Sequence, residues 1–176
     1  MVDTIDQWTK IGIHPSYESY LNPIKIGKEK AELEKITRKP IIRSRQHYLR
    51  LQLPETYRYL LEVGIKEDYT MGFADRAGFR AGICTPFYFY DLKSEMVTDL
   101  KIYPITYMDG SLLKYEKLSV DNAIQKVKKL IDEVKDVNGQ FISLWHNHTL
   151  SNDKEFKGWN DVHTYMIKEL SNSSSL

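Results

Sequence analysis

The amino-acid sequence predicts an α/β fold, in which helices lie outside a largely parallel sheet or barrel. Strand-like and helix-like segments alternate along the chain, and the expected strands are too far apart in sequence for hairpins. The 176 residues suit one domain that buries about two thirds of its unfolded surface. We therefore expect a single domain over residues 1–176, with a disordered serine-rich tail at 171–176.

Four helices are expected. Residues 26–37 combine strong helix formers with opposite charges at helical spacing, and residues 54–61 carry proline in their first turn. Residues 120–137 follow Ser119, a good N-cap, and repeat apolar side chains every three to four positions. Residues 160–170 form a last amphipathic segment, so helices separate most of the expected strands.

The expected strands are short apolar or aromatic segments, at residues 10–13, 41–42, 87–90, 102–105 and 141–145. Residues 68–86 carry three glycines and no clean period, which predicts a long loop around a site. Side chains that follow a strand end are held by rigid backbone and stay open to a substrate. Candidate functional residues are therefore sought there.

Composition excludes several classes of protein. Lys and Arg total 25 against 24 Asp and Glu, a formal charge of +1, which argues against nucleic acid or an anionic membrane as partner. The single cysteine, Cys84, excludes an internal disulfide framework and a thiolate metal cluster. No segment approaches the ~20 apolar residues of a membrane span, and residues 1–6 lack signal-peptide features. We expect a cytoplasmic protein.

Histidines follow two of the expected strands. The apolar segment 141–145 ends at His146, and residues 11–13 end at His14. Tyr17 and Glu18 place a phenol and a carboxylate within one tight turn of His14. Imidazoles delivered by separate strand ends suggest a metal-assisted or acid/base site, although a lone turn histidine often has no such role.

Two arginine-containing segments are further candidates. His47 lies between Arg45 and Arg50, a density of cations that suits a carboxylate or sugar hydroxyls, or alternatively a solvated basic turn. Arg80 is flanked by glycines that let the backbone approach a ligand, or that serve a tight turn.

Other patterns do not single out a residue. Asp68, Asp75, Asp91 and Asp109 each follow or punctuate an apolar segment, so any of them suits a general base and none is favoured by spacing. The letters His-Asn-His at 146–148 invite a nuclease interpretation, but those residues come from separated positions in such enzymes. The balanced charge also argues against a nuclease.

Five segments in order resemble the polysaccharide deacetylase superfamily, also called the NodB-homology or carbohydrate esterase family 4 group, and particularly a bacterial branch associated with surface-polysaccharide loci. The segments are Ile-Gly-Ile-His-Pro-Ser-Tyr at 11–17, Ser-Arg-Gln-His-Tyr-Leu-Arg at 44–50, Asp-Tyr-Thr-Met-Gly-Phe-Ala-Asp at 68–75, Gly-Phe-Arg-Ala-Gly at 78–82 and Leu-Trp-His-Asn at 144–147. Together they extend over most of the chain.

The resemblance implies a distorted (β/α) barrel and a divalent metal, usually zinc, held by an aspartate and two histidines. His14 matches the first histidine of the His-x-x-x-His metal motif. The second position falls at Glu18, which ligates through oxygen, unless His47 takes that role. His146 matches the late histidine that protonates the leaving amine, and Arg80 loosely matches an arginine that lines the site. We expect the substrate to contact Tyr17, Arg45, Trp145 and Asn147.

The resemblance also implies a first strand with paired aspartates upstream of residue 11, where this sequence has residues 1–10. We therefore expect an incomplete barrel that lacks the first strand and corresponds to the C-terminal part of such a protein. The expected activity is metal-dependent hydrolysis of N-acetyl groups on a saccharide of cell-surface polysaccharide metabolism. Alternatives are an inactive carbohydrate-binding remnant, or a fragment that needs a partner chain or a second copy to complete its barrel.

Overall fold

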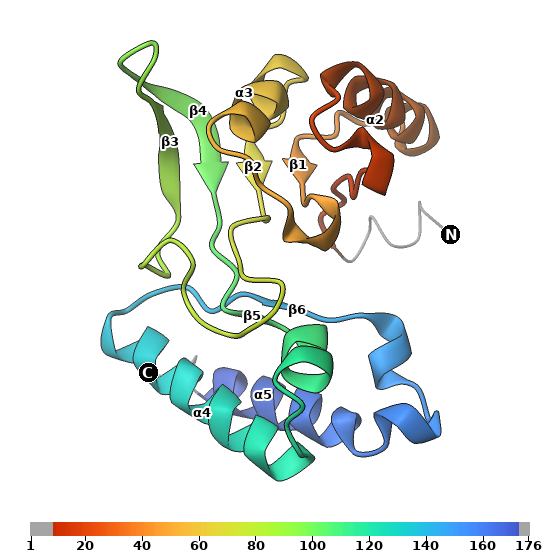
Figure 1. The fold of residues 1–176 in the computed structure, drawn as a ribbon, viewed down its shortest axis with the longest axis vertical. Helices are drawn as coiled ribbons and strands as arrows, with labels where there is room; N and C mark the ends of the chain where they lie inside the picture. The colour runs from red at the N-terminus through yellow and green to blue at the C-terminus, as the bar shows by residue number, and fades with distance from the viewer. Residues whose placement is uncertain (1–8, 173–176) are drawn as a thin grey trace. The chain divides into compact units, whose positions relative to one another are not determined.

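A computed structural model describes residues 9–172 (Figure 1). The contacts of the chain form two compact units, one of residues 9–71 and 86–104, the other of residues 72–85 and 105–172. The expectation of one domain over residues 1–176 stays a prediction. Of the tail expected at 171–176, residues 171–172 belong to the last helix, which corrects that boundary, and 173–176 lie outside the described residues.

The first unit contains a four-stranded sheet in the order β1-β2-β4-β3, formed by Arg43–Ser44, Glu67–Asp68, Met96–Ile102 and Phe87–Asp91 respectively. β1, β2 and β4 are parallel, and β3 runs antiparallel to β4. Ile13 forms a parallel bridge with Ser44 at the other side of β1. His14, Arg45 and Tyr69 therefore follow the same, carboxyl edge of neighbouring strands.

Two helices pack next to each other in this unit, α2 (Pro23–Thr37) and α3 (Glu55–Glu62), with short 3-10 turns η1 (Tyr17–Ser19) and η2 (His47–Leu49) (Figure 1). The Asn22 side chain caps α2 by accepting from the Lys25 amide, and left-handed Arg38 ends that helix. The buried apolar side chains of the unit include Ile13, Ile26, Ile41, Tyr57, Leu60, Ile65, Leu100 and Ile102.

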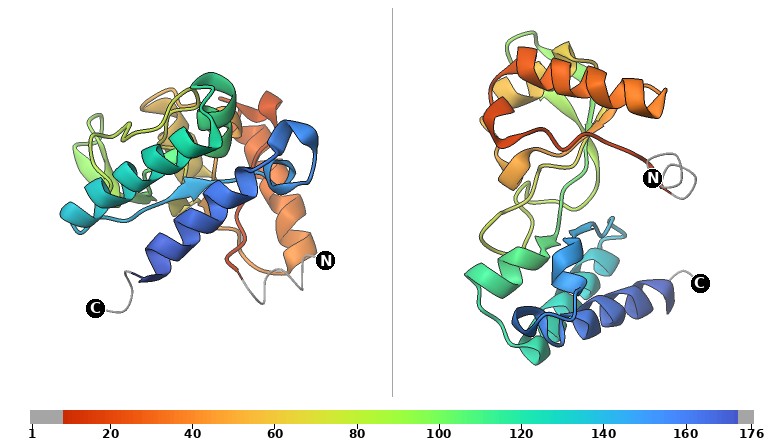
Figure 2. Two further views of the ribbon diagram at one scale, coloured as in Figure 1. Left: turned by 90° about the horizontal axis from the view of Figure 1, so that it is seen from below. Right: turned by 90° about the vertical axis from the view of Figure 1, so that its right-hand side faces the viewer.

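The second unit has a two-stranded parallel sheet of β5 (Tyr107–Met108) and β6 (Ser143–Leu144). Helices α4 (Val120–Asp136) and α5 (Trp159–Asn172) pack against each other, as both views of Figure 2 show. The shorter helices are η3 (Ser111–Tyr115), η4 (Asn147–Leu150) and η5 (Lys154–Phe156). The core consists of Tyr107, Leu112, Ala123, Val127, Leu130, Ile131, Trp159, Val162 and Met166. The apolar stripe predicted for 120–137 therefore faces this core.

The strands differ most from expectation. β3 and β4 form a hairpin, so the inference that no strands are joined by hairpins was wrong; an Asp91 carboxylate that accepts from the Lys93 amide shapes its turn. The segment 102–105 is the end of β4 and the loop after it. Residues 10–13 contribute a single bridge, and β1 lies two residues beyond the expected 41–42.

The described residues thus form a mixed α/β structure with two open sheets, in which most strand pairs are parallel as predicted, although β2 and β5 were not among the expected strands. Between residues 9 and 172, no helix is both long and apolar enough to cross a membrane.

Candidate functional site

Each unit carries one group of predicted site residues at the carboxyl ends of its parallel strands. In the first unit His14 follows the bridging Ile13, and His47 lies three residues beyond β1. In the second, Asp109 follows β5 and His146 lies two residues beyond β6. Strand ends of this kind hold catalytic groups in parallel α/β folds, because the strands fix the positions from which the side chains start.

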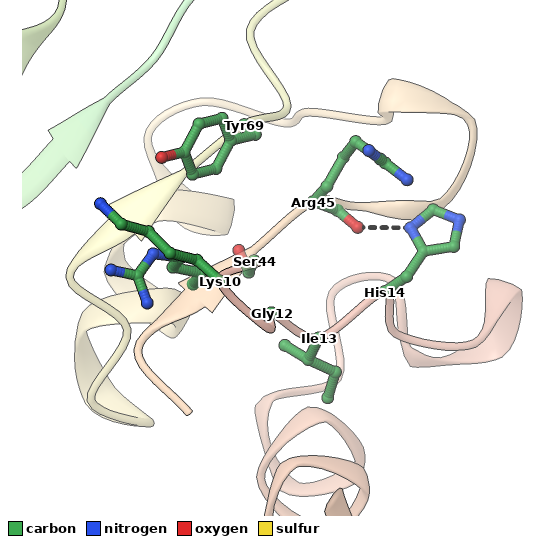
Figure 3. Close-up of a pocket in the computed structure, with 8 residues that line it drawn as sticks. Lys10, Gly12, Ile13, His14, Ser44, Arg45 and Tyr69 are labelled. Atoms are coloured by element: carbon green, nitrogen blue, oxygen red, sulfur yellow. Dashed lines mark hydrogen bonds between the residues drawn. The ribbon is translucent and has the colours of Figure 1, made fainter. Parts of the chain in front are cut away.

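His14 is oriented by the backbone of the neighbouring strand end. Its Nδ1 lies 2.6 Å from the carbonyl oxygen of Arg45 (Figure 3). Because a carbonyl oxygen only accepts, Nδ1 carries the hydrogen and the lone pair of the neutral ring is on Nε2. A histidine held in this way presents Nε2 to a metal ion or a proton.

The rings of His14 and His47 lie together, with centroids 4.7 Å apart and planes at 24°. An ion bound by two imidazoles must lie in the plane of each ring, whereas these two rings are stacked in nearly parallel planes. Their spacing alone therefore does not define a metal site. The expected role of His14 and His47 as ligands of one divalent metal stays a prediction.

Glu18 is placed differently from the two histidines. Its carboxylate lies 2.6 Å from Lys25 Nζ with 80% of the side chain exposed, and this bond lowers the Glu18 pKa. Among residues 9–172, no three His, Cys, Asp or Glu side chains are grouped so that they could hold a metal ion. The expected role of Glu18 as a ligand stays a prediction.

A cavity of about 350 Å³ opens beside His14 (Figure 3). It is lined by Lys10, Gly12, Ile13, His14, Arg43, Ser44, Arg45 and Tyr69. Three of these residues are cationic, and one of them, Arg43, is paired with Glu67 at 2.7 Å. The volume lies in the usual range for small-ligand sites, and most of the lining residues carry a polar or charged group that can bond to a hydroxyl-rich ligand.

In the second unit, the buried Asp109 carboxylate holds His146 by two bonds. Oδ1 lies 2.7 Å from His146 Nδ1, and Oδ2 accepts from the His146 backbone amide at 2.8 Å. Oδ1 also accepts from the Gly110 amide. The carboxyl group has no exposed surface, whereas 42% of the His146 side chain is exposed. Asp109 therefore fixes the ring with Nε2 as its outer nitrogen.

The other predicted residues of this unit have structural contacts. The Trp145 indole packs edge-on to Tyr107 and His163, and its N–H donates to the Tyr107 hydroxyl. The exposed Asn147 side chain accepts from the His148 amide, and Arg80 donates to the Gly72 carbonyl at 3.1 Å. These contacts hold the side chains in place, and their expected roles at the substrate stay predictions.

Sequence reasoning did not single out Asp109 or Asp68. Asp68 accepts from both the hydroxyl and amide of Thr70 and from the Ser44 hydroxyl, and it is fully buried. Burial raises its pKa to about 6, against the lowering effect of those bonds. Asp109 follows β5 as His146 follows β6, but only the pairing of these two strands in the structure places the two residues together.

No protein-family model matches the sequence, and no curated protein matches it. Solved structures do match this chain. A crystal structure assigned as a polysaccharide deacetylase from Mycobacterium smegmatis matches with a TM-score of 0.64 and 16% identity over 96% of this chain. One from Bordetella bronchiseptica, assigned as a polysaccharide deacetylase involved in O-antigen biosynthesis, has a TM-score of 0.45 and 16% identity over 89%. This chain spans 59% of each.

The class defined by fold and strand-end residues is thus a parallel α/β protein with polar groups at the carboxyl edge. More narrowly, the chain has the fold of the mycobacterial polysaccharide deacetylase structure over nearly all of its length, which confirms the resemblance seen in the sequence at the level of fold.

Proposed function

We propose that this protein is a deacetylase that hydrolyses N-acetyl groups on a saccharide. The observation that carries the proposal is the Asp109–His146 pair, a buried carboxylate bonded to a half-exposed imidazole at the end of a parallel strand. The deacetylase-type fold of the chain supports it.

Hydrolysis of an amide needs a proton donor, because a neutral amine is a far better leaving group than the deprotonated amine. Water adds to the acetyl carbon, the carbon–nitrogen bond breaks, and protonated His146 gives the proton on Nε2 to the departing nitrogen. One proton of the added water returns to His146 and the other goes to the amine, so that acetate and a protonated amino sugar result. Asp109 keeps Nδ1 protonated and stabilises the imidazolium before the transfer, as a buried carboxylate does for the histidine of a hydrolase triad.

A divalent metal, zinc in the first instance, would be held by His14 and His47 in the first unit, where it would act as a Lewis acid and favour ionisation of water. Arg45 and Tyr17 would bind sugar hydroxyls beside these rings, and Arg80 would support the site in the other unit. A distorted barrel, a role in cell-surface polysaccharide metabolism, a cytoplasmic location and assembly with a second copy or partner chain stay predictions of the sequence.

The test is acetate release from N-acetylglucosamine oligomers by zinc-loaded protein, with the free amino groups counted in the same samples. We expect turnover by the wild type and a loss of about 100-fold or more in His146→Ala, the usual contribution of a positioned acid. His163→Ala is the matched control, because that ring contacts Trp145 and belongs to no proposed step. Undiminished release by His146→Ala would refute the role of this residue.

A further inference from the structure

Three tyrosines, one histidine and one arginine form a group beside the metal-binding candidates, and two of the tyrosines are exposed. Tyr17 meets His47 and Tyr48 edge-on, with centroids 6.3 and 5.9 Å away, and His47 lies 4.9 Å from Tyr48. Tyr17 is 55% exposed and Tyr48 60% exposed. Rings of this size are normally buried, so their joint exposure indicates a surface that contacts something else.

The Arg50 guanidinium is held by the faces of two of these rings. Its central carbon lies 3.7 Å from the Tyr20 ring centre and 4.7 Å from that of Tyr17. Stacking occupies the flat faces of a guanidinium, whereas its N–H groups point outward in the plane. Within residues 9–172 no carboxylate lies at ion-pair distance from Arg50. The two rings thus hold the Arg50 guanidinium with its N–H donors directed outward in its own plane.

The backbone under this group is in an uncommon conformation. Tyr48 and Leu49 both have positive φ values, 55° and 51°. Each such residue costs roughly 1–3 kcal/mol, which persists where the surrounding structure requires it. Leu49 is buried, and the turn directs the neighbouring Tyr48 ring to the surface.

Tyr17, His47, Tyr48 and Arg50 line a depression of about 610 Å³. That volume is within the range of small-ligand pockets. Aromatic walls accept the apolar C–H face of a sugar ring, and a guanidinium edge binds a carboxylate by two parallel bonds. This depression therefore combines an aromatic wall with a guanidinium edge.

We propose that this depression, the tyrosine–arginine subsite, binds an acidic sugar unit of the substrate, with its ring against Tyr48 and its carboxylate on Arg50. The inference rests on the proposed function, whose substrate it narrows to N-acetylated saccharides that contain hexuronic acid. His14 stacks on His47 at the border of the subsite, so the acidic unit would lie beside the residues expected to bind a metal.

The experiment compares a hyaluronan tetrasaccharide, which alternates N-acetylglucosamine with glucuronic acid, with its carboxyl methyl ester by titration calorimetry. We expect the acid to bind about tenfold more tightly than the ester, since a charge-assisted bidentate bond is lost in the ester. Arg50→Gln should bind acid and ester equally. Arg50→Lys, which keeps the charge without the planar fork, should retain part of the preference.

Controls separate this site from general charge attraction. Lys28→Gln removes one exposed positive charge from α2 and should leave the preference unchanged, whereas Tyr48→Ala should weaken acid and ester alike. Equal binding of acid and ester by the wild type, a preference that survives in Arg50→Gln, or no binding of the acid by folded protein would each overturn the inference. Acetate is assayed separately, so selective binding without deacetylation would refute the proposed function alone.

Discussion

The Ser44 hydroxyl donates to Oδ2 of Asp68 at 2.7 Å, which joins β1 to β2 inside the first unit. Thr70 donates to the same oxygen from its hydroxyl and to Oδ1 from its amide, and its hydroxyl accepts from the Gln46 amide. This buried network fixes the two strands whose ends carry Arg45 and Tyr69. The strand positions therefore depend on a carboxyl group with no cation bonded to it among the described residues.

Asp68→Asn should change how stability depends on pH. Burial raises the Asp68 pKa from 3.8 to about 6, so the charged form is disfavoured in the folded state. Its favourable contribution is complete below pH 3.8 and is lost as the pH rises through about 6. The shift corresponds to about 3 kcal/mol, so between pH 4 and pH 8 the wild type should lose about that much more stability than the variant.

Urea unfolding at both pH values measures this difference. All groups other than residue 68 are the same in both proteins, so their contributions cancel in the comparison. Parallel pH profiles of wild type and Asp68→Asn would show that the carboxyl group ionises as easily in the folded chain as in the unfolded one.

Gly139→Ala should destabilise the second unit by about 1–3 kcal/mol, the usual cost of overpacking. The added methyl group would overlap the Cys84 sulfur, which is buried. In a Cys84→Ala background most of that loss should disappear, because the obstructing atom has gone. Thermal unfolding of the single and double variants gives the coupling between the two sites; additive losses would contradict the steric explanation.

A glycine with room for a side chain should give the opposite change in stability on substitution. Gly27 lies within α2 and a methyl group there meets only Val63, at an ordinary 3.5 Å. Gly27→Ala should therefore raise stability by about 0.5–1 kcal/mol through helix propensity, which chemical denaturation can resolve. A loss instead would mean that the helix packs more closely there than the structure shows.

The long helices could be predicted because many residues report the same period. Helix α4 has a capping Ser119 and five buried side chains at helical spacing. The strands β1, β2, β5 and β6 contain two residues each, too few to show an alternation. The β3–β4 hairpin was missed because Met96 and Val97 are exposed and do not mark a buried face.

The site was predictable where a histidine follows an apolar segment, as at His14 and His146. The carboxylate partner of His146 could not be predicted in this way, because Asp109 lies 37 residues before His146 and only the pairing of β5 with β6 brings them together. The stacking of His14 on His47, from turns 33 residues apart, likewise depends on the bridge between Ile13 and Ser44.

His14→Ala and His47→Ala should each lower zinc bound per chain after dialysis at neutral pH, because both imidazoles are proposed as ligands of the same ion. Loss of a direct ligand is expected to weaken affinity by more than the ~10–100-fold typical of outer partners. Metal analysis by mass spectrometry gives the readout without any need for turnover. His163→Ala should bind as the wild type does, and equal zinc in all four proteins would show that these histidines hold no metal.

Chemical rescue of His146→Gly tests the central role of the Asp109–His146 pair most directly. We expect acetate release from N-acetylglucosamine oligomers to fall about 100-fold or more in this variant and to recover in part, in proportion to added imidazole. Addition of imidazole to the wild type should have no such effect. Release by His146→Gly at the wild-type rate without imidazole would show that His146 is not the proton donor.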